Sequence, residues 1–206
     1  MLVAFDIDGT LFDTKKEIIQ SMNAVLGRHN IEGIPDSEAN LFIGPSFHAT
    51  LSEYRGISAS LTEAIVSEFR EEYQEIVAFS KPYLDCHALI KLLHQSGFRV
   101  CIATNKPMRQ VKALLNHSNL YQYFDTIETR ELNSQKKEDM LIRIREKFPN
   151  EERYYMVGDT EGDCSAALAV GYEFIEARYG YGEFKHRNKL VADTLSDVWK
   201  IVNRRY

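Results

Sequence analysis

The stretch Leu2–Thr14 constrains the fold more strongly than any other part of the chain. It is an apolar run broken by Asp6 and Asp8 and then by Gly9-Thr10, which predicts a buried strand that ends in a tight loop. Where the chain turns at the end of that strand, the two carboxylates can converge on one ligand. Close carboxylates stay ionised together only near a cation, and hard oxygen ligands favour Mg²⁺. The two acids alone would also fit an ordinary buried strand followed by an Asp-Gly turn.

Residues 15–81 are predicted to be helical, with short loops between the helices. Apolar residues recur at helical spacing from Ile18 to Leu26. A capping box at Ser60–Glu63 predicts the start of a longer helix, which Lys81-Pro82 ends. We therefore expect a helical domain, residues 15–81, inserted into a core domain made of residues 1–14 and 82–206.

The rest of the chain alternates between predicted strands and helices. Apolar runs predict strands at 98–103, 123–128, 153–157 and 172–176, and the segments between them predict helices at 85–96, 107–116, 138–148 and 164–170. Pro107 suits the first turn of its helix, and Tyr179–Gly182 is predicted to be a loop. This order predicts an α/β fold, a doubly wound parallel sheet with helices on both faces. Right-handed crossovers would place the loops that follow the strands along one edge.

Composition and charge exclude several classes of function. The chain has 206 residues, 44% of them apolar, which is enough for a full core, and its net charge is −5. Without a run of Lys and Arg, it lacks the charge pattern of a nucleic-acid-binding protein, and no apolar stretch approaches the ~18 residues of a membrane span. Three cysteines without CxxC spacing indicate reduced thiols in a cytoplasmic protein.

Two more loops carry candidate functional groups. Thr104-Asn105 lies between a predicted strand and a predicted helix, where backbone N–H groups and the helix dipole favour a phosphate, although such a pair is also typical of simple capping. Gly158-Asp159 follows another predicted strand, and Asp163 four residues on also fits a helix N-cap. Four acids at one sheet edge would be costly without a divalent ion.

These motifs resemble those of the haloacid dehalogenase (HAD) superfamily. The unbroken pattern Asp6–Thr14 resembles the first motif, Ala103–Pro107 the second motif of phosphoglycolate-phosphatase-like members, and Gly158–Asp163 the fourth. The resemblance implies a Rossmann-like core, an α-helical cap and an Mg²⁺-dependent phosphatase. In it, Ile43–Phe47 is similar to a cap loop that faces the substrate.

The resemblance also implies roles for individual residues. Asp6 would be the nucleophile that forms an aspartyl phosphate, and Asp8 the general acid and base. The family's active-site lysine is Lys136 or Lys137, and we favour Lys137 because Lys137–Leu141 resembles the family's form of this motif. The implied phosphate-binding residues are Thr104, Asn105 and Gly9. The implied metal ligands are Asp6, Asp8 through its backbone carbonyl, Asp159 and Asp163.

A small phosphorylated metabolite is the expected substrate, with no nucleic-acid or membrane partner. His48, Arg55 and Arg70 are candidates for contacts with an anionic substrate, although each is also typical of a solvated surface. One alternative is a phosphosugar mutase, which shares the core and cap but returns the phosphoryl group to its product. Another is a phospho-accepting signalling module, which would be only ~120 residues long and would lack a helical insertion after the first strand.

Overall fold

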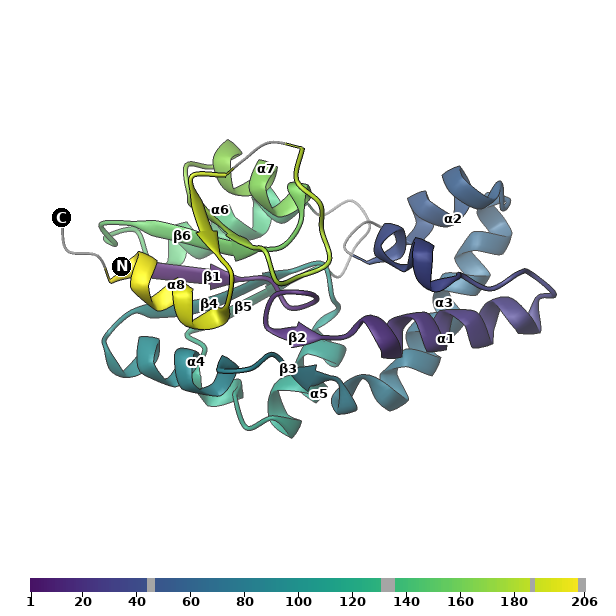
Figure 1. The fold of residues 1–206 in the computed structure, drawn as a ribbon, viewed down its shortest axis with the longest axis horizontal. Helices are drawn as coiled ribbons and strands as arrows, with labels where there is room; N and C mark the ends of the chain where they lie inside the picture. Colours follow the sequence, from purple (N-terminus) through teal and green to yellow (C-terminus); the bar gives the residue numbers. More distant parts are fainter. Residues whose placement is uncertain (44–46, 131–135, 186–187, 204–206) are drawn as a thin grey trace.

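The structure, a computed structural model, describes residues 1–43, 47–130, 136–185 and 188–203. Its centre is a sheet of six parallel strands in the order β5-β4-β1-β6-β7-β8 (Figure 1). These strands are β1 (Leu2–Phe5), β4 (Arg99–Thr104), β5 (Thr126–Thr129), β6 (Tyr154–Gly158), β7 (Glu173–Ala177) and β8 (Leu190–Ala192). The first strand in the chain is therefore a central strand, paired with β4 on one side and β6 on the other.

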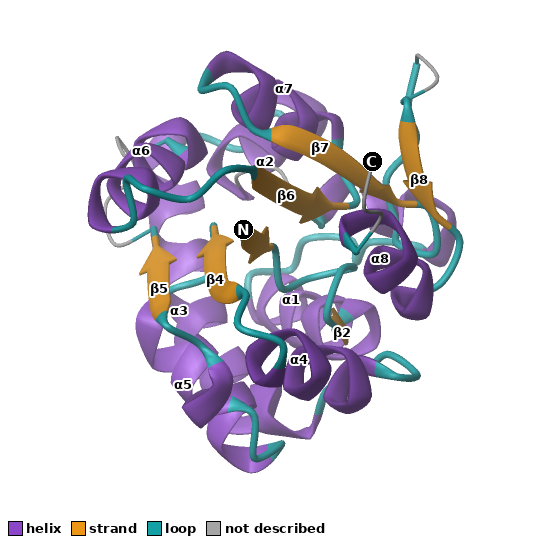
Figure 2. Ribbon diagram, turned by 90° about the vertical axis from the view of Figure 1, so that its left-hand side faces the viewer, coloured by secondary structure: helices purple, strands orange, loops and turns teal. Residues whose placement is uncertain are grey.

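Helices cover both faces of the sheet (Figure 2). One face packs against α4 (Cys86–Gln95), α5 (Met108–His117) and α8 (Leu195–Val202), and the other against α6 (Lys137–Lys147) and α7 (Glu161–Ala169). Because successive strand side chains point to opposite faces, Val3 and Phe5 join the first of these cores, and Leu2 and Ala4 join the second. This explains why β1 is apolar at every position and fully buried.

A block of helices lies between β2 (Phe12–Asp13) and β3 (Lys81–Pro82), which pair with each other as a short antiparallel ladder. It contains α1 (Lys15–Arg28), η1 (Asp36–Phe42), α2 (Phe47–Arg55), α3 (Ala59–Ile76) and η2 (Val77–Phe79). Figure 1 places this block beyond the carboxyl end of β1. The chain therefore leaves the sheet region and returns to it at adjacent points.

The predicted doubly wound parallel sheet is confirmed, two local expectations need correction, and two further features were not predicted. The helix predicted to open with a capping box at residues 60–63 begins at Ala59, after the N-cap residue Ser58, whose side chain makes no capping bond. Pro107 lies outside the first turn of α5 as its N-cap, with extended backbone (ψ 148°). The pair β2 and β3 and the terminal β8 and α8 were not predicted, and a two-residue strand such as β2 or β3 is too short to carry a sequence pattern. No helix in the described part of the chain is long and apolar enough to cross a lipid bilayer.

Candidate active site

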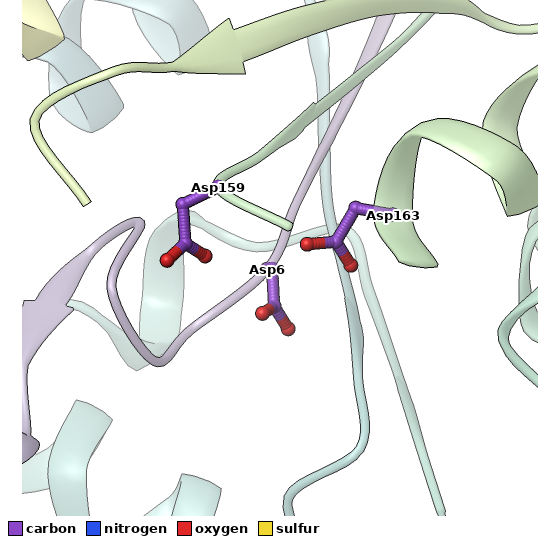
Figure 3. Close-up of side chains that lie close together, drawn as sticks. All are labelled: Asp6, Asp159 and Asp163. Carbon is purple, nitrogen blue, oxygen red and sulfur yellow. The ribbon is translucent and has the colours of Figure 1, made fainter. Parts of the chain in front are cut away.

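Three carboxylates meet at the carboxyl edge of the sheet (Figure 3). Asp6 follows β1, Asp159 follows β6, and Asp163 lies in the first turn of α7. One oxygen atom of each lies within 4.8 Å of the others, and all three residues are buried, with 5% or less of their surface exposed. Strands β1 and β6 are hydrogen-bonded neighbours, so the acids that follow them come together through the sheet register.

Hydrogen bonds from neighbouring backbone and hydroxyl groups hold two of these acids in place. Asp163 accepts hydrogen bonds from the backbone N–H (3.1 Å) and the hydroxyl (2.7 Å) of Thr160, which is the N-cap of α7. Asp159 accepts from the Thr10 hydroxyl (3.2 Å) and from the Tyr181 backbone N–H (2.8 Å). Asp163 therefore completes a capping box and also belongs to the acidic cluster.

Among the residues that the structure describes, one ammonium group, that of Lys137, pairs with the cluster. Lys137, the first residue of α6, places Nζ 3.0 Å from Asp6 Oδ1 and in contact with Asp163 Oδ1. Its side chain is buried, and although burial lowers its pKa, the carboxylates of Asp163 and Asp6 raise it overall. Lys136 is exposed, and its backbone N–H donates to Asp139 (3.1 Å). Of the two lysines left open by the sequence, Lys137 therefore contacts the acids.

Negative charge in the cluster exceeds what one lysine can balance. Burial, followed by repulsion from Asp163 and Asp6, raises the pKa of Asp159 to about 8. Burial also raises the pKa of Asp6 to about 6, against the attraction of Lys137. Three buried carboxylate oxygens this close together are a suitable donor set for a hard divalent cation such as Mg²⁺.

The side chain of Asp8 lies apart from this cluster. Its Oδ1 accepts from the Thr14 hydroxyl (2.6 Å) and pairs with Lys106 Nζ (2.9 Å). The same ammonium donates to the Tyr73 hydroxyl (3.2 Å) and lies 4.5 Å from the centre of the Tyr73 ring. Of the predicted metal ligands, Asp8 is thus the one whose carboxylate is not among the three clustered acids.

Sequence reasoning missed Lys106. It is buried, with 5% of its surface exposed, although it directly follows Thr104-Asn105. A lysine after a strand is normally solvated, and this one is covered because Tyr73 of α3 lies over it. The only available signal was its place inside the second motif.

The predicted phosphate-binding residues have different positions. Thr104 and Asn105 line a cavity in front of Asp6 and Asp8. The backbone N–H of Gly9, in contrast, donates to the Phe12 carbonyl (3.0 Å), so in this conformation it is not available to a phosphate. Gly9 has a φ of +75°, and a Cβ there would lie 2.2 Å from Asp159 Oδ2, so this position requires glycine.

The cavity has a volume of about 100 Å³ and lies between the sheet edge and the helical block. Core residues form its floor, and the block contributes mainly apolar side chains, together with Arg70. Arg55 instead donates to Glu38 (3.0 Å) and Gly33 (3.3 Å) within the block. Residues 44–46 and the side chain of His48 lie outside the part of the chain that the structure describes, so the predicted roles of the 43–47 loop and His48 stay predictions.

The fold and this site define a class of α/β protein, with a buried cluster of acids and a lysine at the carboxyl edge of a parallel sheet. Residues 3–177 match a family model described as haloacid dehalogenase-like hydrolase. The phosphoglycolate phosphatase of Aquifex aeolicus (strain VF5) is 28% identical over 192 residues, which cover 87% of this chain and 85% of that protein. The tyrosine-protein kinase PtkA of Mycobacterium tuberculosis (strain ATCC 25618 / H37Rv) is 32% identical over 188 residues, 88% of this chain but 63% of that protein.

Among solved structures, a predicted phosphatase from Clostridium acetobutylicum superposes with a TM-score of 0.88 and 27% identity, covering 98% of this chain and 97% of that one. The chain belongs to the haloacid dehalogenase-like hydrolase family. Within that family it is a phosphatase that resembles the phosphoglycolate phosphatases. The predicted superfamily and enzyme class are thereby confirmed.

Proposed function

We propose that this enzyme is an Mg²⁺-dependent phosphomonoester hydrolase that acts on a small phosphorylated metabolite through an aspartyl phosphate on Asp6. The observation that supports this most is the position of Asp6 at the floor of the cavity, paired with Lys137 at 3.0 Å and clustered with Asp159 and Asp163. A carboxylate that attacks a phosphate dianion is repelled by it, so the site needs positive charge on both partners.

In this proposal each residue has a role that follows from its position in the site. The Asp6 carboxylate attacks phosphorus, while Lys137 stabilises the charge that Asp6 and the phosphate share. Thr104 and Asn105 bind the phosphate oxygens at the other wall of the cavity. Mg²⁺, held by Asp6, Asp159, Asp163 and the Asp8 carbonyl, would neutralise the phosphate.

Asp8 is the general acid and base of the proposed reaction. It would protonate the leaving alkoxide in the first step and deprotonate the water that hydrolyses the aspartyl phosphate in the second. Its carboxylate is half-buried and lines the cavity beside Asp6. A halide leaving group would need no acid, so an aspartate at this position favours phosphoryl transfer.

The helical block is the proposed cap. We propose residues 1–14 and 82–206 as the core domain and 15–81 as a cap domain that closes over the substrate, with a hinge near the paired β2 and β3. The apolar lining from the block and the small cavity support a small metabolite as substrate. A cytoplasmic location belongs to the same proposal and is supported by three free cysteines.

The decisive test is a panel of phosphorylated metabolites assayed with Mg²⁺ and with EDTA, using wild-type protein and Asp6→Asn. We expect Mg²⁺-dependent phosphate release from wild type, and a loss of at least about 10³-fold in Asp6→Asn because the amide cannot act as the nucleophile. Asp193→Asn is the matched control, since Asp193 is exposed and pairs only with Arg178 among the described residues. Near-normal turnover by Asp6→Asn would contradict the covalent mechanism, and a requirement for a sugar bisphosphate would indicate the mutase instead.

A further inference from the structure

The loop Tyr179–Gly182, which the proposed chemistry does not use, packs directly on the acidic cluster. The Tyr179 hydroxyl donates to the Thr10 carbonyl (2.9 Å). A Cβ on Gly180 would lie 2.3 Å from Asp159 Cβ, and a Cβ on Gly182 would lie 2.0 Å from the Asp159 carbonyl oxygen. At Gly180 and Gly182 the loop backbone therefore lies so close to Asp159 that a side chain at either position would collide with it.

Tyr181 contacts both Asp159 and the start of the helical block. Its backbone N–H donates to Asp159 Oδ2 (2.8 Å), and its hydroxyl donates to Asp13 Oδ1 (2.6 Å). The same hydroxyl accepts from the backbone N–H groups of Thr14 (2.7 Å) and Lys15 (3.1 Å). One side chain thus joins an acid of the cluster to the point where the chain enters α1.

These contacts satisfy two backbone N–H groups at the start of α1. Thr14 is the N-cap of α1, but its side chain makes no capping bond. The first N–H groups of a helix need an acceptor, and the Tyr181 hydroxyl accepts from the backbone N–H groups of Thr14 and Lys15. The Thr14 hydroxyl itself donates to Asp8 Oδ1 at 2.6 Å.

We propose that Tyr181 is a positioning residue that couples the metal ligand Asp159 to the acid and base Asp8 through Thr14, and that fixes the first turn of the cap helix α1. The inference rests on the proposed function, because it takes Asp159 as a metal ligand and Asp8 as the proton-transfer group. When a cation orders Asp159, the N–H of Tyr181 is held with it, and the phenol then holds the backbone of Thr14 and Lys15.

The phenol keeps its proton over the working range of the enzyme. Burial, together with the hydrogen bond to Asp13, holds the pKa of Tyr181 well above its ordinary value. The hydroxyl can therefore donate to Asp13 and accept from the two backbone N–H groups at the same time. The coupling requires the hydroxyl. Tyr181→Phe should therefore abolish the coupling while it keeps the ring and the backbone N–H that donates to Asp159.

Hydrogen–deuterium exchange with and without MgCl₂ tests the link without any turnover. In wild type, Mg²⁺ should slow exchange of the Thr14 and Lys15 amides by about fivefold or more, a coupling at the low end of the usual range. In Tyr181→Phe the same amides should change by less than about twofold, while residues near Asp159 still respond to Mg²⁺. Tyr179→Phe is the matched control, because it removes a hydroxyl of the same loop that contacts Thr10 and leaves the bonds to Thr14 and Lys15 in place.

Kinetics provide a second readout, which a general loss of stability would not produce. If Tyr181 acts on Asp8, Tyr181→Phe should lose about tenfold more kcat/KM on an alkyl phosphate than on para-nitrophenyl phosphate, because kcat/KM reports the first step and the aryl leaving group departs with little help from an acid. If Tyr181→Phe does not fold, Thr14→Val cuts the same path one residue later. That variant should keep the Mg²⁺ effect at the Lys15 amide and show the same dependence on the leaving group.

The outcomes separate this inference from the proposed function. Two results would overturn the coupling and leave the phosphatase proposal intact. One is that Mg²⁺ protects the Thr14 and Lys15 amides of Tyr181→Phe as strongly as those of wild type. The other is that Mg²⁺ does not protect these amides in a wild-type protein that is active. Equal losses of kcat/KM on both substrates would overturn the path to Asp8. A wild type that neither binds Mg²⁺ nor hydrolyses any phosphate would overturn both.

Discussion

Lys106 holds a positive charge in a buried position where only Asp8 and the Tyr73 phenol contact it at close range among the described residues. We expect Lys106→Met, which keeps the length of the side chain, to lower kcat/KM by about 10²-fold, because the proton-transfer group loses a partner that orients it. Steady-state kinetics with the best substrate of the metabolite panel would measure the effect. Lys91→Met, on the exposed face of α4, is the matched control. Normal kcat/KM in folded Lys106→Met would show that Thr14 alone orients Asp8.

Asp159 makes the metal-free protein sensitive to pH. Its pKa is raised from 3.8 to about 8, so between these values the folded state binds more protons than the unfolded state. Stability then falls as pH rises through this window. In EDTA, raising the pH from 5 to 8 should lower the melting temperature of wild type more than that of Asp159→Asn. The difference should correspond to a few kcal/mol in the free energy of unfolding.

Thermal unfolding with EDTA or MgCl₂ at several pH values would measure this difference. Mg²⁺ should stabilise wild type more at pH 8 than at pH 5, since at the lower pH it competes with protons on Asp159 and Asp6. Asp159→Asn, which keeps an oxygen acceptor for the Tyr181 N–H, should respond only weakly to Mg²⁺. Parallel pH curves for the two metal-free proteins would contradict a raised pKa at Asp159.

At the scale of elements, the loop Tyr179–Gly182 can be tested through its glycines. A Cβ on Gly182 would collide with the Asp159 backbone, so Gly182→Ala should destabilise the protein by about 2 kcal/mol or more and weaken Mg²⁺ binding. Gly27→Ala should have the opposite effect on stability, because Gly27 lies within α1 and a Cβ there would meet no atom within 4 Å. It should stabilise the protein by about 0.5–1 kcal/mol.

Chemical denaturation and calorimetric Mg²⁺ titration would compare the two variants. Equal stability of both proteins would mean that the loop moves away from Asp159 without cost. A loss of stability in Gly182→Ala with unchanged Mg²⁺ affinity would show that the loop supports the fold but not the acidic cluster.

The elements themselves were predictable to different degrees. The strands β4 and β6 were predicted within one residue of their bounds, and β1 was predicted as a buried strand that ends in a tight loop. The ladder of β2 and β3 was not, because two-residue strands carry no pattern and form only when Pro82 meets Phe12 from across the helical block. Short elements of this kind depend on the tertiary structure.

The same distinction explains the site. Asp6, Asp159 and Thr104 were found because each follows an apolar run, and the sheet edge then brings them together. Tyr181 and Lys106 were not predicted because their contacts come from parts of the chain far away in sequence, Asp13 in one case and Tyr73 in the other. A pattern within a single segment cannot reveal such a pair.

At the scale of the whole molecule, we expect the helical block, as the proposed cap, to limit substrate size. The cavity of about 100 Å³ between the block and the sheet edge has room for a phosphate and a few carbon atoms. We expect small phosphorylated metabolites to react with kcat/KM at least about 100-fold higher than a peptide that carries phosphotyrosine. Para-nitrophenyl phosphate, assayed beside both, controls for intrinsic reactivity of aryl esters. Comparable rates on the peptide would show that the cap opens far enough for a macromolecule.

The central position of β1 has a consequence for how the protein is made. Leu2 pairs with Arg99 on one side and with Tyr154 on the other, so β1 gains its first strand partner only when β4 has been synthesised and its second only when β6 has. The helices of residues 15–76 make mostly local contacts and can form earlier, whereas such long-range strand pairing is slow and leaves an apolar segment open to aggregation. A nascent chain that stops before β6 can pair β1 with β4 alone and lacks both Asp159 and Asp163. We therefore expect such truncated chains to leave one edge of β1 unpaired, and phosphatase activity to require β6 beside β1.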